Sequence, residues 1–281
     1  MRRLDDLKKR SFVSALAIIL VFFIIYFSNN IYIKPLVVIV IGALAYFALK
    51  EYLDFALRKN VTLSKAILSA AVIFEVIAFF IFSQFFVFAM MPLIVFFLFV
   101  VVLFISNFNK IENSFNKIAF SVFGFVYIAI PIAMILPILY LNSFQAQDGR
   151  MWLFYLIFIT KITDIGAYFG GKLFGKKKLI EKVSPKKTVF GSVSGFIVAI
   201  IASYGFTYFS KPNFFDISIA EALVLGAILS IGSQIGDLSE SLLKRDVGIK
   251  NSSNIPGIGG ILDMMDSLIL NIPITYFFLM G

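Results

Sequence analysis

Two clusters of polar residues interrupt the otherwise apolar last fifth of the chain. One runs from Gln234 to Arg245 and the other from Pro256 to Asp266. Charged side chains at membrane depth are costly, so those that occur there usually serve a function. We therefore expect the chemistry of this chain to involve these two clusters.

Three aspartates in the clusters could hold a metal ion. On a helix, Asp237 shares one face with Ser241 and Lys244, because these residues are about one turn apart. Asp263 and Asp266 lie one turn apart at the start of the last apolar run. The sequence has no histidine and no cysteine, so a metal would rest on carboxylates, which favour hard cations such as Mg²⁺. The alternative is that Asp263 and Asp266 complement a helix dipole while Asp237 forms an ion pair.

Glycines and lysines could bind phosphate groups near these aspartates. Gly257, Gly259 and Gly260 would let the backbone turn tightly and approach a ligand. Upstream, Lys176–Lys178 and Ser184–Thr188 precede another apolar run. Lysines can hold phosphates as point charges, and amides at a helix start could add donors. An ordinary cytoplasmic loop would carry the same lysines, so that interpretation stays open.

A further carboxylate, Asp164, closes an earlier apolar run. It lies one turn after Lys161, so the two side chains could pair and neutralise each other. The glycines that follow, Gly166, Gly170 and Gly171, could serve a site or allow close helix packing.

Membrane-spanning helices must position these residues. The 281 residues are 60% hydrophobic, well above the share in soluble domains. Apolar runs of about 20 residues recur, long enough to cross a hydrocarbon core as helices. We expect an all-α polytopic membrane protein and not a β-barrel, whose strands would be short and alternating. The nine expected spans are 11–28, 31–49, 63–82, 85–105, 118–141, 151–170, 190–209, 218–238 and 261–280.

Basic residues predict the orientation of the spans. With a cytoplasmic N-terminus, 21 of the 25 lysines and arginines fall on the cytoplasmic side and two fall outside. Cytoplasmic loops are enriched in these residues, so the split supports the number of spans and their direction. We expect the first run to be retained, because no small-residue cleavage site follows it. We divide the chain into 1–145, with spans one to five, and 146–281, with spans six to nine and the candidate catalytic residues.

Several motifs together carry a resemblance. Gly236-Asp237-Leu238 with Glu240-Ser241 is similar to G-D-x-x-E-S, Asp164 with Ala167-Tyr168 to D-x-x-A-Y, and Ser184–Thr188 to S-P-K-K-T. The pattern S-x-x-K-R-x-x-x-x-K-D-x-x-x-x-x-P-G-H-G-G-x-x-D-R-x-D is matched by Ser241, Lys244, Arg245, Lys250, Pro256, Gly257, Gly259, Gly260, Asp263 and Asp266, with four residues before Pro256 where the pattern has five. These patterns and their order resemble the phosphatidate cytidylyltransferase (CDP-diacylglycerol synthase) family.

The resemblance implies an activity and its surroundings. The enzyme would transfer a cytidylyl group from CTP to phosphatidate, giving CDP-diacylglycerol and pyrophosphate. Mg²⁺ would be the cofactor, with a monovalent cation as a further option. The protein would lie in the cell (plasma) membrane among bilayer lipids, with its active site on the cytoplasmic side. We expect no nucleic-acid partner, and a homodimer stays open.

The resemblance also implies roles for particular residues. The catalytic residues would be Asp237, Asp263, Asp266 and Lys244. The metal ligands would be Asp237, Asp263, Asp266 and Asp164. The substrate would be bound by Ser184, Lys186, Lys187, Thr188, Ser241, Arg245, Lys250, Gly257, Gly259 and Gly260.

Four positions depart from the family pattern. The pattern has histidine at Ile258, arginine at Met264, aspartate at Asn251 and glutamate at Phe190. Loss of a charged contact in a phosphoryl-transfer site can lower the rate by orders of magnitude. A weakened or non-catalytic homologue that binds metal or lipid is therefore one alternative. A transporter is another, although transporters more often place charges near the midplane in a repeated arrangement.

Overall fold

The structure is a computed structural model that describes residues 23–109, 111–141, 147–210, 215, 217–253 and 259–280. In these ranges, eight helices are long and apolar enough to cross a membrane. The strands found there form a single two-stranded hairpin. The expected all-α polytopic membrane fold is confirmed.

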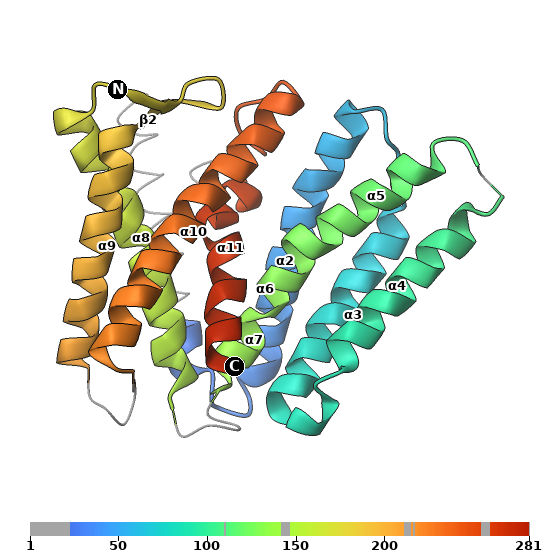
Figure 1. The fold of residues 1–281 in the computed structure, drawn as a ribbon. Coiled ribbons are helices and arrows are strands. Elements are labelled where there is room, and N and C mark those ends of the chain that lie inside the picture. Colours follow the sequence, from blue (N-terminus) through green and yellow to red (C-terminus); the bar gives the residue numbers. More distant parts are fainter. Residues whose placement is uncertain are drawn as a thin grey trace, which may run out of the picture. The chain divides into compact units, whose positions relative to one another are not determined.

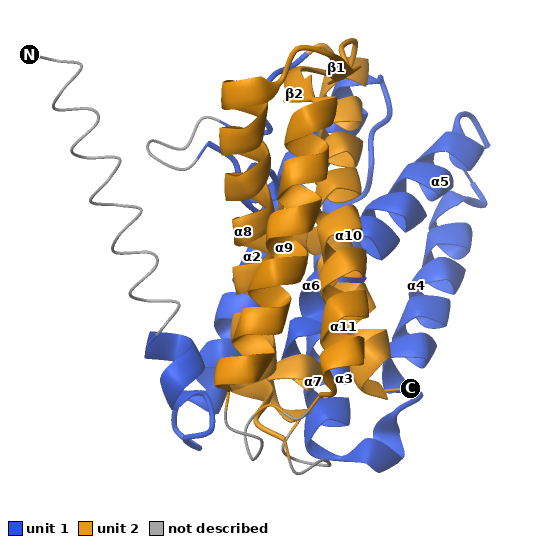
Figure 2. Cartoon of the chain, turned by 60° about the vertical axis from the view of Figure 1, so that its left-hand side comes forward, with its two compact units in different colours: residues 1–136, 249–264 blue, residues 137–248, 265–281 orange. Residues whose placement is uncertain are grey.

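The chain divides into two compact units, which Figure 2 shows in different colours. Unit 1 comprises residues 1–136 and 249–264, and unit 2 comprises residues 137–248 and 265–281. Each unit therefore joins a long continuous stretch to a shorter piece from the C-terminal region.

Unit 1 contains the helices of the first half of the chain. Prolines lie in the first turns of α2 and α4, where their missing N–H groups would have had no helical partner. Ser64 begins α3, because its hydroxyl accepts a hydrogen bond from Ile67 N at 3.4 Å. The elements are α2 (Lys34–Arg58), α3 (Lys65–Gln84), the 3₁₀ turn η1 (Phe86–Phe88), α4 (Met91–Asn107), α5 (Ser114–Gly124), the π-helical turn η2 (Phe125–Ala129), α6 (Ile130–Ala133) and α7 (Ile135–Leu139), which continues into unit 2 (Figure 1).

The packing of α2 against α5 fixes the C-terminal half of α2. The Tyr52 hydroxyl donates to Phe120 O at 3.0 Å, and the tyrosine is buried. Its ring lies so close to Gly124 that an added Cβ there would come within 2.5 Å of it. Glycine at position 124 therefore lets a large buried side chain of α2 pack directly against the next helix.

Unit 2 contains the helices and the hairpin that carry most of the candidate motifs. Asp148 caps α8 by accepting from Arg150 N at 3.0 Å, and Ser218 and Glu221 form a capping box at the start of α10. The elements are α8 (Gly149–Phe174), β1 (Lys178–Ile180), β2 (Ser184–Thr188), α9 (Val189–Phe209), α10 (Ile219–Asp246) and α11 (Ile261–Met280), whose first four residues belong to unit 1.

Glycines bring α8 and α9 close together. A Cβ on Gly191 would lie 2.6 Å from Ala167 O, and one on Gly195 would lie 2.8 Å from Thr163 O. A Cβ on Gly170 would meet the Ser194 hydroxyl at 1.9 Å. Of the glycines after Asp164, for which the sequence left close packing open, Gly170 makes such an approach, in keeping with small residues at membrane helix interfaces.

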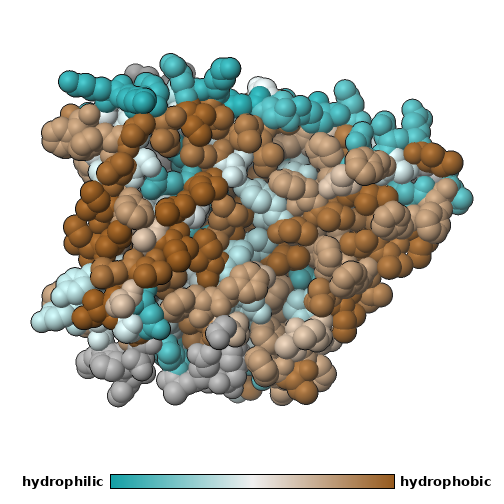
Figure 3. Space-filling view, in the orientation of Figure 1, coloured by the Kyte–Doolittle hydropathy of each residue, from teal (hydrophilic) through white to brown (hydrophobic). Residues whose placement is uncertain are grey.

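Hydrophobic side chains point outward in both units. In unit 1, α4 exposes Leu93, Phe97 and Val101, and in unit 2, α9 exposes Ile197 and Ile201. Figure 3 shows hydrophobic residues along the middle of these helices, with hydrophilic residues gathered at helix ends. Outward-facing apolar surface of this kind fits lipid around each unit.

Eight of the nine expected spans correspond to the observed helices, with differences at the ends. The expected span 11–28 lies largely outside the described residues. The expected spans 31–49 and 218–238 are too short, because α2 continues to Arg58 and α10 to Asp246. An apolar run marks where a helix meets lipid, whereas the helix itself can continue into the polar boundary. The β1–β2 hairpin lies in a segment for which no secondary structure was expected.

Candidate active site

The hairpin brings the Ser184–Thr188 motif to α10. β1 and β2 are antiparallel, with Lys178 opposite Thr188 and Ile180 opposite Ser184. Lys187 Nζ lies 2.7 Å from Asp237 Oδ2, and the two side chains are 26% and 30% exposed. The ion pair that the sequence offered as an alternative role for Asp237 is therefore present, and its partner comes from a different motif.

Thr188 links the hairpin to α9. Its hydroxyl accepts a hydrogen bond from Gly191 N at 3.1 Å, and the residue is buried as the N-cap of that helix. A Cβ on Gly175 would come within 2.4 Å of the same hydroxyl. The Thr188 side chain thus packs where glycines make room for it, while the neighbouring Lys186 is exposed.

The polar residues that were expected on one helix face, Asp237, Ser241 and Lys244, all lie on the continuous helix α10. The Ser241 hydroxyl donates to Asp237 Oδ1 at 3.5 Å. Lys244 forms an ion pair with Glu240, and both residues are buried. Arg245 Nε donates to Val183 O at 3.3 Å and so ties the helix end to the turn of the hairpin. Sequence reasoning gave no role to Glu240, although this residue lies inside the segment that is similar to G-D-x-x-E-S.

Asp164 and Asp266 share a hydroxyl group. Ser267 Oγ lies 3.3 Å from Asp164 Oδ2 and 3.0 Å from Asp266 Oδ1. Ser233 Oγ donates to the other oxygen of Asp164 at 3.3 Å. Lys161 Nζ lies 3.7 Å from Asp164, so the expected pair is present but is only one of its contacts. Sequence reasoning missed Ser267, whose only signal was its place next to Asp266.

A glycine also brings α10 and α11 into contact beside Asp266. A Cβ on Gly236 would lie 2.4 Å from the carbonyl oxygen of Asp266. Gly236 precedes Asp237, so this approach brings the Asp237 backbone next to the helix that carries Asp266. Asp164, Asp237 and Asp266 thus lie on three helices of unit 2 that are linked by these contacts.

The donor atoms of this group suit a hard cation. They are carboxylate and hydroxyl oxygens, the kind of ligand that Mg²⁺ prefers. Within the described ranges, no three acidic side chains form a cluster that could hold a metal ion as it stands. Asp237 is instead held by an ammonium group, that of Lys187. A cation would therefore fit the chemistry of the site but would require these side chains to rearrange.

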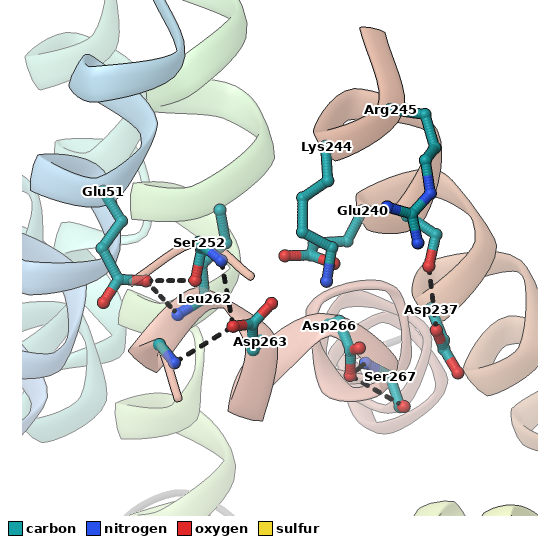
Figure 4. A network of polar contacts seen from close by, with 12 residues as sticks. Glu51, Asp237, Glu240, Lys244, Arg245, Ser252, Leu262, Asp263, Asp266 and Ser267 are labelled. Carbon is teal, nitrogen blue, oxygen red and sulfur yellow. Dashed lines mark hydrogen bonds and ion pairs between the residues drawn. The ribbon is translucent and has the colours of Figure 1, made fainter. Parts of the chain in front are cut away.

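In unit 1, Asp263 stabilises the start of α11. Its Oδ2 atom accepts from the backbone N atoms of Ser252 and Gly260, both at 3.0 Å (Figure 4). The alternative role at a helix N-terminus is thus observed for Asp263. Glu51 of α2 binds the same region, by accepting from Ser252 Oγ and from the backbone N atoms of Ile261 and Leu262. Sequence reasoning missed Glu51, which lies outside every motif.

Of the other predicted site residues of unit 1, Lys250 and Gly259 lie near this region. Gly257 and the departure at Ile258 are outside the described residues. Gly259 has φ +87°, a conformation that favours glycine. Lys250 is exposed and lines a pocket with Asp54 and Arg58 of α2.

Two other departures have visible surroundings. Phe190, where the family pattern has glutamate, lies with its ring centroid 5.2 Å from that of Phe174. Met264, where the pattern has arginine, is 39% exposed. Phe190 therefore makes an aromatic contact at a position where the pattern expects a charge.

A match to a known protein family extends over nearly the whole chain, and matches to individual proteins cover about half to two thirds of it. Residues 8–280 match a family described as the cytidylyltransferase family. The chain is 44% identical over 163 residues to a phosphatidate cytidylyltransferase of Chlamydia muridarum, covering 56% of this chain and 52% of that protein. It is 36% identical over 185 residues to one of Bacillus subtilis, covering 65% and 66%. It is 40% identical over 132 residues to one of Haemophilus influenzae, covering 46% of each. The chain thus spans about half the length of the first of these relatives.

Proposed function

Because the chain belongs to the cytidylyltransferase family, we propose that it transfers a cytidylyl group from CTP to phosphatidate. The products would be CDP-diacylglycerol and pyrophosphate. The names of the similar proteins support this substrate pair, and so does the membrane-spanning fold, because phosphatidate is a lipid.

One structural observation carries the proposal. Four motif residues that are far apart in the sequence gather within unit 2: Asp164, Lys187, Asp237 and Asp266. Three contacts connect the elements that carry these residues. They are the Lys187–Asp237 ion pair, the Ser267 hydroxyl that Asp164 and Asp266 share, and the close approach at Gly236. Cations and carboxylates that lie together on these elements suit a reaction between phosphate anions.

The reaction itself needs little covalent help from the protein. A phosphate oxygen of phosphatidate attacks the α-phosphorus of CTP, and the bond from that phosphorus to the bridging oxygen breaks. Pyrophosphate leaves with the electron pair. The attacking phosphate is already an anion, so no histidine base is required. The main barrier is repulsion between the two anions, which the protein must offset.

Cationic side chains would hold the phosphates. Lys187 is partly exposed, so a substrate phosphate can compete with Asp237 for its ammonium group. Lys186 and Arg245 are exposed and would add positive charge. Lys250 of unit 1 stays a predicted substrate-binding residue on the resemblance alone. Lys244 is buried with Glu240, and we propose that it acts mainly by holding that part of α10 in place. Ser184 and Ser241 would donate hydrogen bonds to substrate oxygens.

A divalent cation would complete the charge balance. We propose that Asp164, Asp237 and Asp266 hold Mg²⁺, while Asp263 stays a predicted ligand on the resemblance alone. When bound, Mg²⁺ would neutralise charge on the phosphates. A monovalent cation beside it, a homodimer, and a plasma-membrane location with a cytoplasmic site are further parts of the proposal.

The release of pyrophosphate tests the proposal. Purified protein in detergent should release pyrophosphate from CTP only when phosphatidate and Mg²⁺ are both present. Omission of phosphatidate is the control. Release that does not depend on phosphatidate would contradict the proposed acceptor, and no release at all would contradict the proposed enzyme.

A non-catalytic homologue that binds metal or lipid is the second candidate. The apolar side chains at Phe190 and Met264 favour it. Met264 cannot donate a hydrogen bond to a phosphate, as the arginine of the pattern could, and Phe190 lacks the charge of the glutamate that the pattern has there. In that case Mg²⁺ would raise the melting temperature of the protein although no pyrophosphate is released.

A further inference from the structure

A buried carboxylate of α2 has no place in the proposed chemistry. Glu51 is 7% exposed and lies outside all the motifs that resemble the family. Burial of an ionised carboxylate is costly unless hydrogen bonds replace the lost water. The surroundings of Glu51 provide such bonds.

Glu51 accepts three hydrogen bonds from residues more than 200 positions further along the chain. Its Oε2 atom accepts from Ser252 Oγ at 2.7 Å and from Leu262 N at 2.9 Å. Its Oε1 atom accepts from Ile261 N at 2.9 Å. Figure 4 shows the carboxylate directed at Ser252 and Leu262. Ile261 and Leu262 are the first two residues of α11, so Glu51 binds N–H groups that have no partner within the helix.

The residue before α11 explains why a distant side chain is needed. This residue is Gly260, which has no side chain to cap the helix. A Cβ at Gly260 would come within 2.6 Å of Glu51 Oε2 and 1.7 Å of Ser252 Oγ. The Glu51 carboxylate therefore approaches the helix start closely and takes the place of a local cap. Its negative charge also complements the helix dipole.

Asp263 binds the same region from inside α11. It accepts from Gly260 N, as the third helical residue does in a capping box, and also from Ser252 N. The usual second half of that box, an N-cap side chain, is replaced by Glu51. Glu51 and Asp263 together hold Ser252 and the first turn of α11, which lie on either side of the predicted glycine turn.

We propose that Glu51 is a positioning residue for Asp263, the carboxylate of unit 1 that the resemblance makes a catalytic residue. It holds Ser252 and the start of α11, and through them the carboxylate of Asp263, in the arrangement that cytidylyl transfer requires. This role rests on the proposed function, but the order of the segment around Ser252 can be measured without any activity.

The chain offers a matched pair of variants for the test. Glu51→Gln removes the charge and replaces one acceptor oxygen with an NH₂ group, which cannot accept a hydrogen bond. Asp54→Asn removes the same charge one turn further along α2, from an exposed side chain. Because the sequence has no cysteine, Ser253→Cys introduces a unique thiol next to Ser252, at a half-buried position. Its reaction rate with a thiol reagent reports how well that segment is held.

The expected result separates Glu51 from Asp54 in two measurements. In the Ser253→Cys background, Glu51→Gln should raise the labelling rate several-fold over Asp54→Asn. The kinetic comparison uses variants that keep the natural Ser253 and have matched melting temperatures. Among these, Glu51→Gln should have a kcat/KM about tenfold lower than Asp54→Asn, which is the equivalent of one charge-assisted hydrogen bond. Ser252→Ala, which removes one of the three donors, should shift both quantities in the same direction by less.

Equal labelling rates for Glu51→Gln and Asp54→Asn would overturn the proposal, as would a raised labelling rate with unchanged kcat/KM. If Glu51→Gln does not survive solubilisation, Ser252→Ala compared with Asp54→Asn decides by the same two measurements. If no protein, the natural sequence included, releases pyrophosphate, the proposed function fails, and the labelling rates still decide whether Glu51 holds this segment.

Discussion

At the scale of residues, the candidate site consists of charges that already have partners. Lys187 pairs with Asp237, Lys161 with Asp164 and Lys244 with Glu240. The first two pairs are partly exposed, so little free energy holds them together and a substrate or cation can separate them. The Lys244–Glu240 pair is buried, and separating it would leave an uncompensated charge. Exposure therefore distinguishes the side chains that can exchange partners from those that hold the site.

Removal of the Lys187 charge should weaken the site. We expect Lys187→Ala to lower kcat/KM for CTP by about 10- to 100-fold, the range for loss of a charged hydrogen bond. Lys182→Ala is the matched control, because Lys182 is exposed in the same hairpin. Steady-state kinetics of pyrophosphate release measure both. A similar loss in the two variants would indicate that only the general positive charge of the loop matters.

Substitution of Asp237 tests whether this residue helps to hold Mg²⁺. Asp237→Asn is nearly isosteric but removes the charge that would bind Mg²⁺, so turnover should fall by at least about 100-fold. The Mg²⁺ concentration for half-maximal stabilisation against heating should rise as well. Full activity of wild type in excess chelator would show that no divalent cation takes part.

The residues that sequence reasoning missed have a common physical cause. Asp237, Asp263 and Asp266 stand out because they are charges within apolar surroundings, and their helical spacing is visible in the sequence. Glu51 and Ser267 act through contacts that only the fold creates. Glu51 binds residues more than 200 positions away, and nothing next to it in the sequence shows that α2 would pass the start of α11.

At the scale of elements, apolar runs predicted the helices well and their ends less well. α2 and α10 continue past their apolar runs into polar sequence, and these extensions carry Glu51 and Lys244. Hydropathy reports the lipid-facing part of a helix, whereas the hydrogen-bonded helix continues for as long as its backbone groups have partners. The β1–β2 hairpin was missed because its strands are short and strongly basic.

Two glycines of α9 test the importance of close packing between α8 and α9. Gly195→Ala would place a Cβ 2.8 Å from Thr163 O, so we expect a loss of about 1–3 kcal/mol from overpacking. Gly205→Ala on the same helix meets nothing within 4 Å and should be neutral or slightly stabilising. Thermal unfolding in detergent compares them. Equal melting temperatures would mean that the two helices can move apart without cost.

At the scale of the whole molecule, composition and charge predicted a membrane protein with a preferred orientation. The helices and their outward apolar side chains confirm the membrane protein. The orientation stays a prediction, and it decides whether the candidate site can reach CTP inside the cell. Basic residues predict it because Lys and Arg are retained on the cytoplasmic side.

Single cysteines can test the orientation, since the sequence contains none. Lys177→Cys should be protected from a membrane-impermeant thiol reagent in intact cells and should react after the cells are opened. Gln145→Cys, in a loop expected outside, should react in both conditions. The reverse pattern would invert the topology and place the lysine-rich hairpin on the outside.

The transfer of label from CTP to lipid tests the central claim most directly. Purified protein should be incubated with phosphatidate, Mg²⁺ and CTP that is labelled at either the α- or the γ-phosphorus, and the lipid should then be extracted. Attack at the α-phosphorus predicts that the α-label appears in a lipid product while the γ-label leaves as pyrophosphate. Absence of α-label from the lipid would contradict cytidylyl transfer, and γ-label in the lipid would indicate a kinase reaction instead.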